Sequence, residues 1–273
     1  MSEAQLRDNA IRDLVIANRI LARENVIDGF GHVSVRHPTN PDRFLLSRSR
    51  SPEVVSRGDI MEFELDGTLV SNDPRRPYAE RYIHGAIYMA RPEINSVSHH
   101  HAHSVIPFSL ADIPLKPAFH MGAVAGAETP VWDSKPDFGD TNMLVDTLEM
   151  GHSLARALGG NATALLRGHG AVCAAPNLAA ICMISIYMRD NAELILNTLP
   201  LGQPKYLSPG EIEKTAAEIK ATLDARLVYL KLALFQQEQG LQVFTLGKEV
   251  IKTRFLRKQL QHESSGVHVH IRH

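Results

Sequence analysis

Apolar residues recur along the chain with two spacings, one typical of helices and the other of strands. Helical spacing and helix-start signals predict helices over residues 4–25, 77–91, 141–158 and 177–198, and from 208 to about 238. Short apolar runs predict strands at 33–36, 43–47, 61–65 and 68–71, with Asp66-Gly67 as a hairpin turn. Strands that stand beside separate helices predict an α/β fold with three layers, α/β/α, around a central, mainly antiparallel or mixed sheet.

No composition shift divides the chain, so we predict one domain over residues 1–240 and a C-terminal extension over 241–273. That extension is basic and contains His262, His268, His270 and His273, whose spacing fits a ligand set poorly and favours a flexible tail or an oligomer contact. A net charge of −1 argues against nucleic acid or an anionic membrane as a partner.

Two further features indicate a cytoplasmic enzyme. The N-terminus has no apolar core typical of a signal peptide, and the two cysteines indicate a reducing compartment rather than a disulfide scaffold. The longest apolar run, 178–188, is too short to span a bilayer and is interpreted as a buried helix.

The most informative segment is 97–103, Val-Ser-His-His-His-Ala-His, which follows the β-branched lead-in 94–97. If this lead-in is a strand, His99, His101 and, further along, His103 point to one face while His100 points to the other. Two imidazoles at i and i+2 can share one metal ion. The alternative is a solvated histidine-rich turn that binds metal only adventitiously.

A second short apolar run, 165–173, contains His169 between two glycines. Glycines beside a histidine allow unusual backbone angles and the close approach of another segment. His169 is therefore a candidate third ligand from an adjacent strand, although such a histidine alone is more often a hydrogen-bonded core or turn residue. Three protein ligands with open positions are typical of a catalytic metal site.

The predicted helix at 77–91 places Glu80, His84 and Tyr88 on one face, because they are four residues apart. Glu80 could be an acid/base group or a labile extra ligand that faces the metal. It could equally be a carboxylate near a helix start, where the helix dipole favours negative charge.

Together these residues resemble the class II aldolase/adducin family over roughly residues 5–205. That family combines a Gly-Asn-x-Ser loop, a helix with a catalytic Glu, a His-x-His strand and a later Asn/Gly-His-Gly, in this order. The resemblance implies a class II aldolase-like fold and the metal ligands His99, His101 and His169, with His103 left out. It also implies a cyclic homotetramer whose metal sites lie at subunit junctions, and the apolar segments 178–188 and 227–230 favour assembly independently. Tyr206 and Tyr229 are possible donors to a neighbouring site.

Two departures from the aldolase pattern concern the substrate. The loop reads Gly31-His32-Val33-Ser34, with His32 in place of the Asn, and Tyr78 and Ala79 precede Glu80 where the sugar-phosphate aldolases have serines. A site that has lost hydrogen-bond donors for phosphate binds phosphate poorly. We therefore expect a substrate other than a phosphosugar.

The loop and the 167–170 segment resemble the decarboxylase branch of the family, whose members remove CO₂ from hydroxylated benzene or pyridine dicarboxylates. This resemblance implies a metal-dependent carboxy-lyase for an aromatic carboxylate such as a dihydroxyphthalate or 3-hydroxy-2-methylpyridine-4,5-dicarboxylate. Glu80 or His84 would deliver the proton to the ring. The expected substrate contacts are His32, Ser34, Arg36, Arg48 and Tyr78, with arginine suited to carboxylates.

Three other functions remain open from the sequence. The same site would serve a metal-dependent aldolase or dehydratase on a non-phosphorylated hydroxy-acid or aldol, or an iron-dependent oxygenase. An adducin-like interaction module ranks last because the ligand residues are all present. Three histidines and a carboxylate suit Mn²⁺ and Zn²⁺ best, with Fe²⁺ and Co²⁺ as further possibilities.

Overall fold

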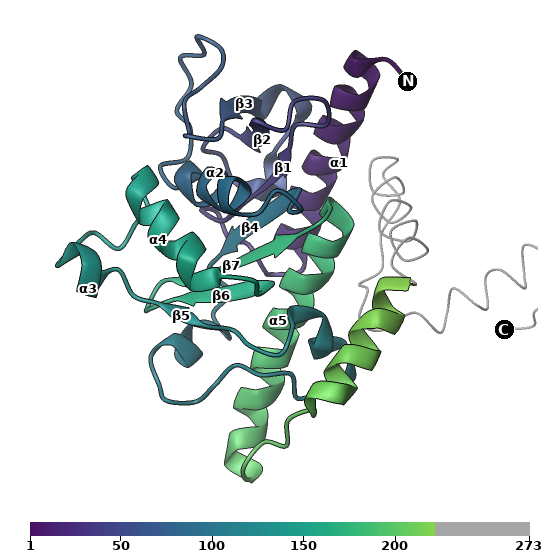
Figure 1. The fold of residues 1–273 in the computed structure, drawn as a ribbon, viewed down its shortest axis with the longest axis vertical. Helices are drawn as coiled ribbons and strands as arrows, with labels where there is room; N and C mark the ends of the chain where they lie inside the picture. The colour runs from purple at the N-terminus through teal and green to yellow at the C-terminus, as the bar shows by residue number, and fades with distance from the viewer. Residues whose placement is uncertain (222–273) are drawn as a thin grey trace, which may run out of the picture. The chain divides into compact units, whose positions relative to one another are not determined.

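The computed structural model describes residues 1–221 and contains a mixed sheet of seven strands (Figure 1). In chain order the strands are β1 (His32–Arg36), β2 (Arg43–Ser47), β3 (Ile60–Glu64), β4 (Ser96–His100), β5 (Val131–Trp132), β6 (Thr163–Leu166) and β7 (Gly170–Ala175). Their order in space is β3-β2-β1-β4-β7-β6-β5, and β5–β6 is the parallel pair among otherwise antiparallel neighbours. The mainly antiparallel or mixed sheet predicted from the sequence is confirmed.

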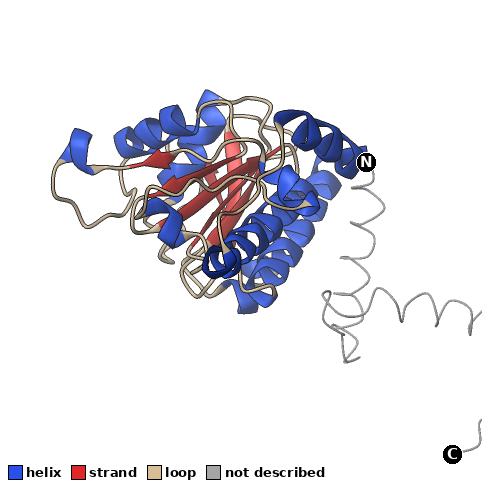
Figure 2. Cartoon of the chain, turned by 90° about the horizontal axis from the view of Figure 1, so that it is seen from below, coloured by secondary structure: helices blue, strands red, loops and turns tan. Residues whose placement is uncertain are grey.

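Helices cover both faces of this sheet and complete the three layers (Figure 2). Helices α1 (Glu3–Arg23) and α5 (Leu178–Thr198) pack on one face, and α2 (Arg81–Ala90) and α4 (Leu148–Leu158) pack on the other. A short α3 (Lys135–Phe138) follows β5, and a further helix occupies 209–221. Short 3-10 turns lie at Pro52–Val54, Arg57–Asp59, Ile106–Ser109, His120–Ala125 and Leu199–Leu201.

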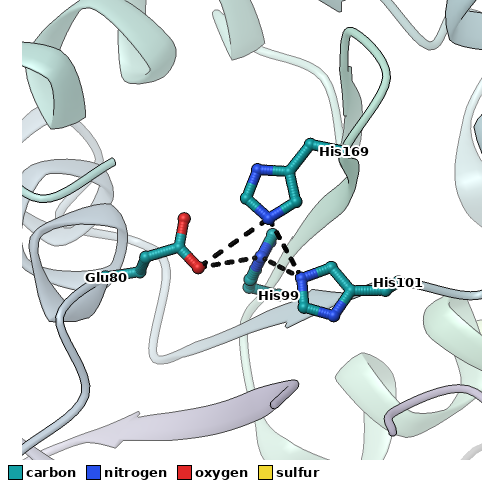
Figure 3. A group of neighbouring side chains, drawn as sticks. All are labelled: Glu80, His99, His101 and His169. Carbon is teal, nitrogen blue, oxygen red and sulfur yellow. Dashed lines mark hydrogen bonds and ion pairs between the residues drawn. The ribbon is translucent and has the colours of Figure 1, made fainter. Parts of the chain in front are cut away.

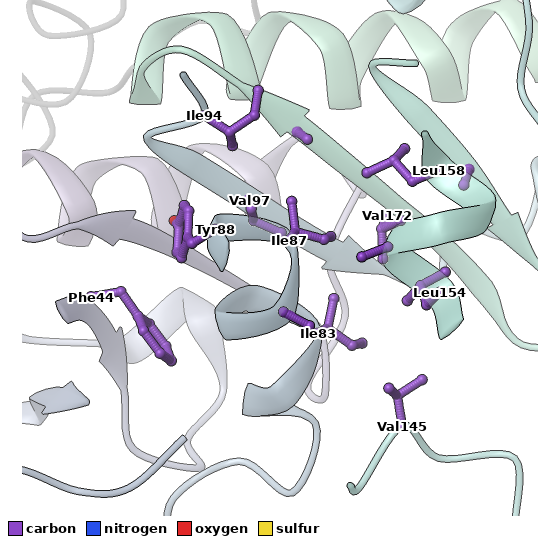
Figure 4. Close-up of a cluster of buried hydrophobic side chains, with 14 of the residues drawn as sticks. Phe44, Ile83, Ile87, Tyr88, Ile94, Val97, Val145, Leu154, Leu158 and Val172 are labelled. Atoms are coloured by element: carbon purple, nitrogen blue, oxygen red, sulfur yellow. The ribbon is translucent and has the colours of Figure 1, made fainter. Parts of the chain in front are cut away.

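The apolar core beneath α2 and α4 fixes where α2 begins relative to the sheet (Figure 4). Ile83 and Ile87 of α2 and Leu154 of α4 are fully buried in one cluster with Val97 of β4 and Val172 of β7. Truncation of such a side chain to Ala costs about 2–5 kcal/mol of stability. The core therefore holds the N-terminal end of α2 over the middle strands, β4 and β7.

Gly85 allows α2 to approach the turn after β3. A Cβ atom at this position would lie 1.8 Å from the Leu65 carbonyl oxygen, so a larger residue would force the helix away. His84 precedes this glycine and is fully buried. The close approach is thus one reason that the helix presents His84 to the sheet.

Several predicted boundaries were wrong. The helix predicted from 77 begins at Arg81, with Glu80 as its N-cap residue, and the helix predicted from 141 begins at Leu148. No strand forms at 68–71: the turn at Asp66-Gly67 is present, but one isolated bridge, Phe63↔Leu69, replaces the ladder. Val70 still donates its N–H to the Glu62 carbonyl of β3, but the chain then leaves the sheet because the turn-forming residues 71–74, which end in a proline, follow.

The apolar segment 178–188 is largely buried within the subunit. It forms the first half of α5, where Ile181, Cys182 and Met188 are almost fully buried because the helix packs on β4, β7 and α1. The segment therefore does not leave the surplus apolar surface that the sequence suggested. Within residues 1–221, no helix has the length and apolar character needed to cross a membrane.

Other expectations fall on residues outside the described part of the chain. These are the end of the last helix near 238, the domain boundary at 240, the 227–230 segment, Tyr229 and the histidines of the extension. The start of that last helix is confirmed, since Ser208 and Glu211 form the reciprocal hydrogen bonds of a capping box.

Candidate metal centre

Three histidines and one glutamate converge on a single point where the central strand β4 ends and β7 begins (Figure 3). The Nε2 atom of His101 lies 3.0 Å from that of His99 and 3.1 Å from that of His169. One carboxylate oxygen of Glu80 lies 3.4 Å from His99 Nε2 and 3.9 Å from His169 Nε2. The four ligand atoms all lie within 4.8 Å of one another.

Strand pairing brings these residues together from distant parts of the chain. His99 belongs to β4 and His101 follows the end of that strand, while β4 pairs with β7. His169 lies in the tight turn between β6 and β7, and not in a strand as the sequence suggested. The two flanking glycines are required there. Gly168 has φ +63°, and a Cβ on Gly170 would lie 2.3 Å from the His100 carbonyl oxygen.

Each of the three imidazoles is oriented by an oxygen acceptor at its Nδ1 atom. The acceptors are the Ala171 carbonyl for His99 (3.1 Å), the Asp28 carboxylate for His101 (3.2 Å) and the Met143 carbonyl for His169 (2.9 Å). Since an oxygen acceptor requires N–H at Nδ1, the Nε2 atoms of the neutral rings carry lone pairs. Three lone pairs that face one another repel unless a cation lies among them. Acceptors of this kind behind the ring are also usual for metal-binding histidines.

The electrostatics of the cluster favour the protonation states that bind a cation. Burial and the neighbouring His99 lower the pKa of His101, and they lower that of His169 to about 4. Burial alone raises the pKa of Glu80, but His99, His169 and His32 outweigh it and lower that pKa below its ordinary value. Neutral imidazoles beside an ionised carboxylate are the forms that bind metal ions.

The donor set therefore fits a divalent metal ion. His99, His101 and His169 would hold it, and Glu80 lies in reach as a fourth ligand or as an acid/base group. Such a set suits Zn²⁺, Mn²⁺, Fe²⁺ and Co²⁺. His103 is exposed and is not among the residues of this cluster.

The backbone of the loop at Val145 fixes one oxygen of the Glu80 carboxylate. This oxygen accepts a hydrogen bond from the backbone N–H of Val145 at 3.0 Å, which leaves the second oxygen for the metal cluster. The Glu80 side chain makes no capping hydrogen bond to α2, although the residue occupies the N-cap position. Its position is therefore explained by the metal cluster and the Val145 loop rather than by the helix.

His84 is placed behind the cluster rather than in it. Its Nε2 lies 2.7 Å from His32 Nδ1, and its Nδ1 lies 2.6 Å from the Ser34 hydroxyl. Burial and the nearby His99 lower the pKa of His84 to about 3, and burial lowers that of His32 well below its ordinary value. Both rings are therefore neutral at physiological pH. Ser34 likewise contacts His84 and not the metal cluster.

The other expected substrate contacts are divided between the site and the scaffold. Tyr78 is buried, and its ring lies 4.5 Å from that of His32, which in turn lies 5.3 Å from His99. Arg48 forms an ion pair with Asp59 at 2.7 Å, beside Arg50.

Arg36 is placed in the scaffold. Its guanidinium donates to the carbonyl groups of Ile94, Pro41, Tyr88 and Arg91. Because its donors are used on the backbone, the position of Arg36 gives it a structural role.

Sequence reasoning missed the groups that orient the ligands. Asp28 accepts hydrogen bonds from the backbone N–H groups of Phe30 and Gly31 and in turn accepts from His101. The Asp28-Gly29 pair is typical of such a turn and could have drawn attention to Asp28. The carbonyls of Met143 and Ala171 carry no sequence signal of this kind.

Comparison with known proteins gives one family and several relatives. The family model described as class II aldolase and adducin N-terminal domain matches residues 12–196. Decarboxylase tropJ of Talaromyces stipitatus is 30% identical over 197 residues, which are 67% of this chain and 74% of that protein. The 3,4-dihydroxyphthalate decarboxylase of Arthrobacter keyseri is 28% identical over 204 residues, 69% of this chain and 78% of that protein.

Aldolases are also among the similar proteins. The L-fuculose phosphate aldolase of Escherichia coli O6:H1 is 28% identical over 192 residues, 70% of this chain and 84% of that protein. The solved structure of L-fuculose 1-phosphate aldolase from Glaciozyma antarctica PI12 superposes with a TM-score of 0.72 at 21% identity, covering 88% of this chain and 95% of that one. The fold is therefore shared with that aldolase structure.

Proposed function

Because this chain belongs to the class II aldolase and adducin family, we propose that it is a metal-dependent carboxy-lyase for a hydroxylated aromatic or pyridine dicarboxylate. Two of its relatives are decarboxylases by name, one of them for 3,4-dihydroxyphthalate. The proposed metal ion is Mn²⁺ or Zn²⁺, held by His99, His101 and His169.

The observation that carries this proposal is the wall beside the metal cluster. His32 and Tyr78 form it, with ring centroids 4.5 Å apart, and both side chains are almost fully buried. An aromatic wall beside a metal cluster suits an aromatic substrate. Ala79, with its methyl side chain, is the residue directly before Glu80, so this wall lacks the hydroxyl that a phosphate would need there.

The reaction requires stabilisation of the electron pair that CO₂ leaves on the ring, and a group that carries one proton to the ring carbon. When bound, the metal ion supplies Lewis-acid stabilisation to a substrate oxygen next to the carboxylate that leaves. Glu80 is ionised in the free site, so it can take the proton of the ring hydroxyl as the substrate binds. After the bond to the carboxylate breaks and CO₂ departs, Glu80 returns this proton to the ring carbon that holds the electron pair. We assign the proton transfer to Glu80 rather than to His84, because both ring nitrogens of His84 are occupied by Ser34 and His32.

CO₂ release from a panel of hydroxylated benzene and pyridine dicarboxylates tests this function. The protein is loaded with Mn²⁺ or Zn²⁺ and its metal content is measured beforehand. We expect at least one member of the panel, which includes 3,4-dihydroxyphthalate, to release stoichiometric CO₂ under anaerobic conditions. Turnover that depends on O₂ would identify an oxygenase, and no CO₂ from any member would refute the decarboxylase.

The second candidate is a metal-dependent aldolase or dehydratase for a non-phosphorylated substrate. The similarity to L-fuculose phosphate aldolase favours it, since the same ligand set would serve an aldol cleavage. A retro-aldol assay with small hydroxy-acids and aldols, run beside the CO₂ assay, separates the two. Aldehyde formation without CO₂ would favour this candidate.

We further propose that the enzyme is a homotetramer whose metal sites need a neighbouring subunit. Phe30 supports this, because it is 77% exposed although it lies in the loop that orients Asp28 and His101. An exposed phenylalanine beside a metal centre is consistent with a contact to another subunit. Light scattering with parallel assays should show that activity falls as the tetramer dissociates, before the fold is lost. A fully active monomer at assay concentration would refute this.

A further inference from the structure

A buried chain of hydrogen bonds runs from the interior of the protein to the wall of the metal centre. The Tyr88 hydroxyl lies 2.7 Å from Ser34 Oγ, which lies 2.6 Å from His84 Nδ1. His84 Nε2 lies 2.7 Å from His32 Nδ1. All four side chains are at most 1% exposed, so water does not compete for these contacts.

The last member of this chain has a free nitrogen next to the metal ligands. His32 faces His99 directly across the β1–β4 pairing, and the two rings are 5.3 Å apart. Its Nε2 atom is buried and has no hydrogen-bond partner in the described part of the chain. Leaving a buried polar atom unsatisfied is costly, and such an atom at a functional site requires a reason. A substrate atom that contacts Nε2 supplies one.

Tyr88, at the far end of this series of hydrogen bonds, determines which atom is the donor in each of them. Tyr88 is a protonated phenol, since burial raises its pKa, and Ser34 Oγ is the acceptor within reach of its proton. Ser34 then uses its own proton for His84 Nδ1, which places the His84 proton on Nε2. That N–H is donated to His32 Nδ1, so the proton of neutral His32 must be on Nε2. In the reverse direction the Tyr88 proton would lose this acceptor.

We propose that the chain Tyr88–Ser34–His84 holds His32 in the tautomer with N–H at Nε2, and that this N–H donates a hydrogen bond to a carboxylate oxygen of the substrate. The second half of the statement rests on the proposed function, whereas the first half does not. His32 is then a catalytic residue in contact with the substrate, and Ser34, His84 and Tyr88 are positioning residues. The hydrogen-bond chain also explains why a histidine, a serine and a tyrosine occur together beside the apolar core between the sheet and α2.

The tautomer can be read directly by nitrogen-15 NMR of the Zn²⁺-loaded protein with labelled histidine. Long-range proton–nitrogen spectra distinguish a protonated ring nitrogen from an unprotonated one, and the H32Q spectrum assigns the His32 signals. We expect Nε2 of His32 to be protonated and Nδ1 not. S34A should shift His32 toward a mixture of tautomers, because His84 loses the donor at its Nδ1.

A matched control is S185A. It removes another fully buried serine hydroxyl, one that lies 2.8 Å from Ser98 on the opposite face of the sheet. This variant should leave the His32 signals unchanged. A wild-type His32 with an unprotonated Nε2, or equal shifts in S34A and S185A, would overturn the proposed chain.

The substrate contact is tested with 3,4-dihydroxyphthalate as the probe, by calorimetry and by kinetics. Loss of a hydrogen bond to a charged group weakens binding by about 10- to 100-fold, and we expect this for His32→Leu at unchanged metal content. His32→Gln, which retains a side-chain N–H donor, should recover part of the affinity. Equal affinities in wild type and His32→Leu would refute the contact.

The two proposals fail in different ways. If wild type binds the probe but releases no CO₂ from any member of the panel, while His32 has the expected tautomer, the proposed function is wrong and the hydrogen-bond chain stands. If wild type does not bind the probe at all, the substrate contact fails together with this choice of substrate. If CO₂ is released but His32 has the opposite tautomer, the function stands and the chain is wrong.

Discussion

His99 and His100 are neighbours in β4, and both side chains are fully buried, yet they lie in different environments. His99 lies on the α2 face, where its Nε2 points to His101 and Glu80. His100 lies on the α5 face, where its Nε2 is 3.7 Å from the sulfur of Cys173. The alternation of side chains along a strand gives one residue type two different roles at consecutive positions.

The difference lies in the groups that each face supplies. On the His99 side, oxygen acceptors hold three rings so that their lone pairs meet, which creates a place for a cation. On the His100 side, burial and the adjacent His99 lower the pKa of His100 to about 3, and its neighbours are a thiol and a backbone N–H. Burial alone therefore does not make a histidine functional, since a ligand site also needs convergence with other donors.

The largest effect should come from His99→Ala, which removes a metal bond. We expect loss of both bound metal and turnover, with the same outcome for His101→Ala and His169→Ala. His100→Gln is the matched control, because it changes the adjacent buried histidine on the other face, and it should retain the metal. Metal analysis after gel filtration measures the metal content of each variant. Loss of metal in a correctly folded His100→Gln variant would contradict the prediction that only the His99 face binds the metal.

The second largest effect should come from Glu80→Gln. The change keeps the shape of the side chain and an acceptor for the Val145 N–H, so most of the metal should remain. Loss of one positioned acid/base group slows a reaction by about 10²–10⁴-fold. Steady-state kinetics at saturating metal measures the effect. Turnover within a few-fold of wild type would reduce Glu80 to a structural residue at the start of α2.

A smaller effect concerns His84, which lies behind His99 on the same face. Its pKa is lowered to about 3 in the folded protein, against an ordinary value near 6.5 in the unfolded chain. Between these two pKa values the unfolded chain is protonated at His84, whereas the folded protein is not. The stability contributed by neutral His84 is therefore fully present above pH 6.5 and is lost as the pH falls toward 3. Between pH 6 and 4.5 this loss amounts to about 2 kcal/mol.

Urea unfolding of the chelator-treated protein at fixed concentration tests this pH dependence. His84→Gln does not titrate at this position, so its stability should fall about 2 kcal/mol less than that of wild type over this interval. Parallel curves for the two proteins would mean that His84 is protonated in the fold.

The smallest effect should come from His103→Ala. His103 is exposed, and the cluster is formed without it. We expect unchanged metal content and turnover, as measured by metal analysis and the CO₂ assay. Metal loss in this variant together with retention in His99→Ala would show that the ligand pair has been assigned in the wrong register.

The sequence determined the family, most elements and the four residues that cluster around the cation position. Strand alternation decides the face of His99, and the glycines beside His169 mark a close approach of another segment. The choice of His99 and His101 over His103 came from the resemblance to the family and not from local spacing. Element ends were less well determined. The start of α2 moved from 77 to Arg81, and one expected strand was reduced to a single bridge, because turns depend on hydrogen bonds that periodicity does not describe.

The tertiary structure alone decided the environment of each of these residues. Arg36 and His84 have the residue types of a substrate site, but the fold uses the first to satisfy backbone carbonyls and the second to hold His32. Asp28 and the Met143 carbonyl orient His101 and His169, two of the proposed metal ligands, from loops far away in the chain. The physical reason is that periodicity sets the direction of a side chain, whereas its partners depend on strand order and on the loops that return to the sheet.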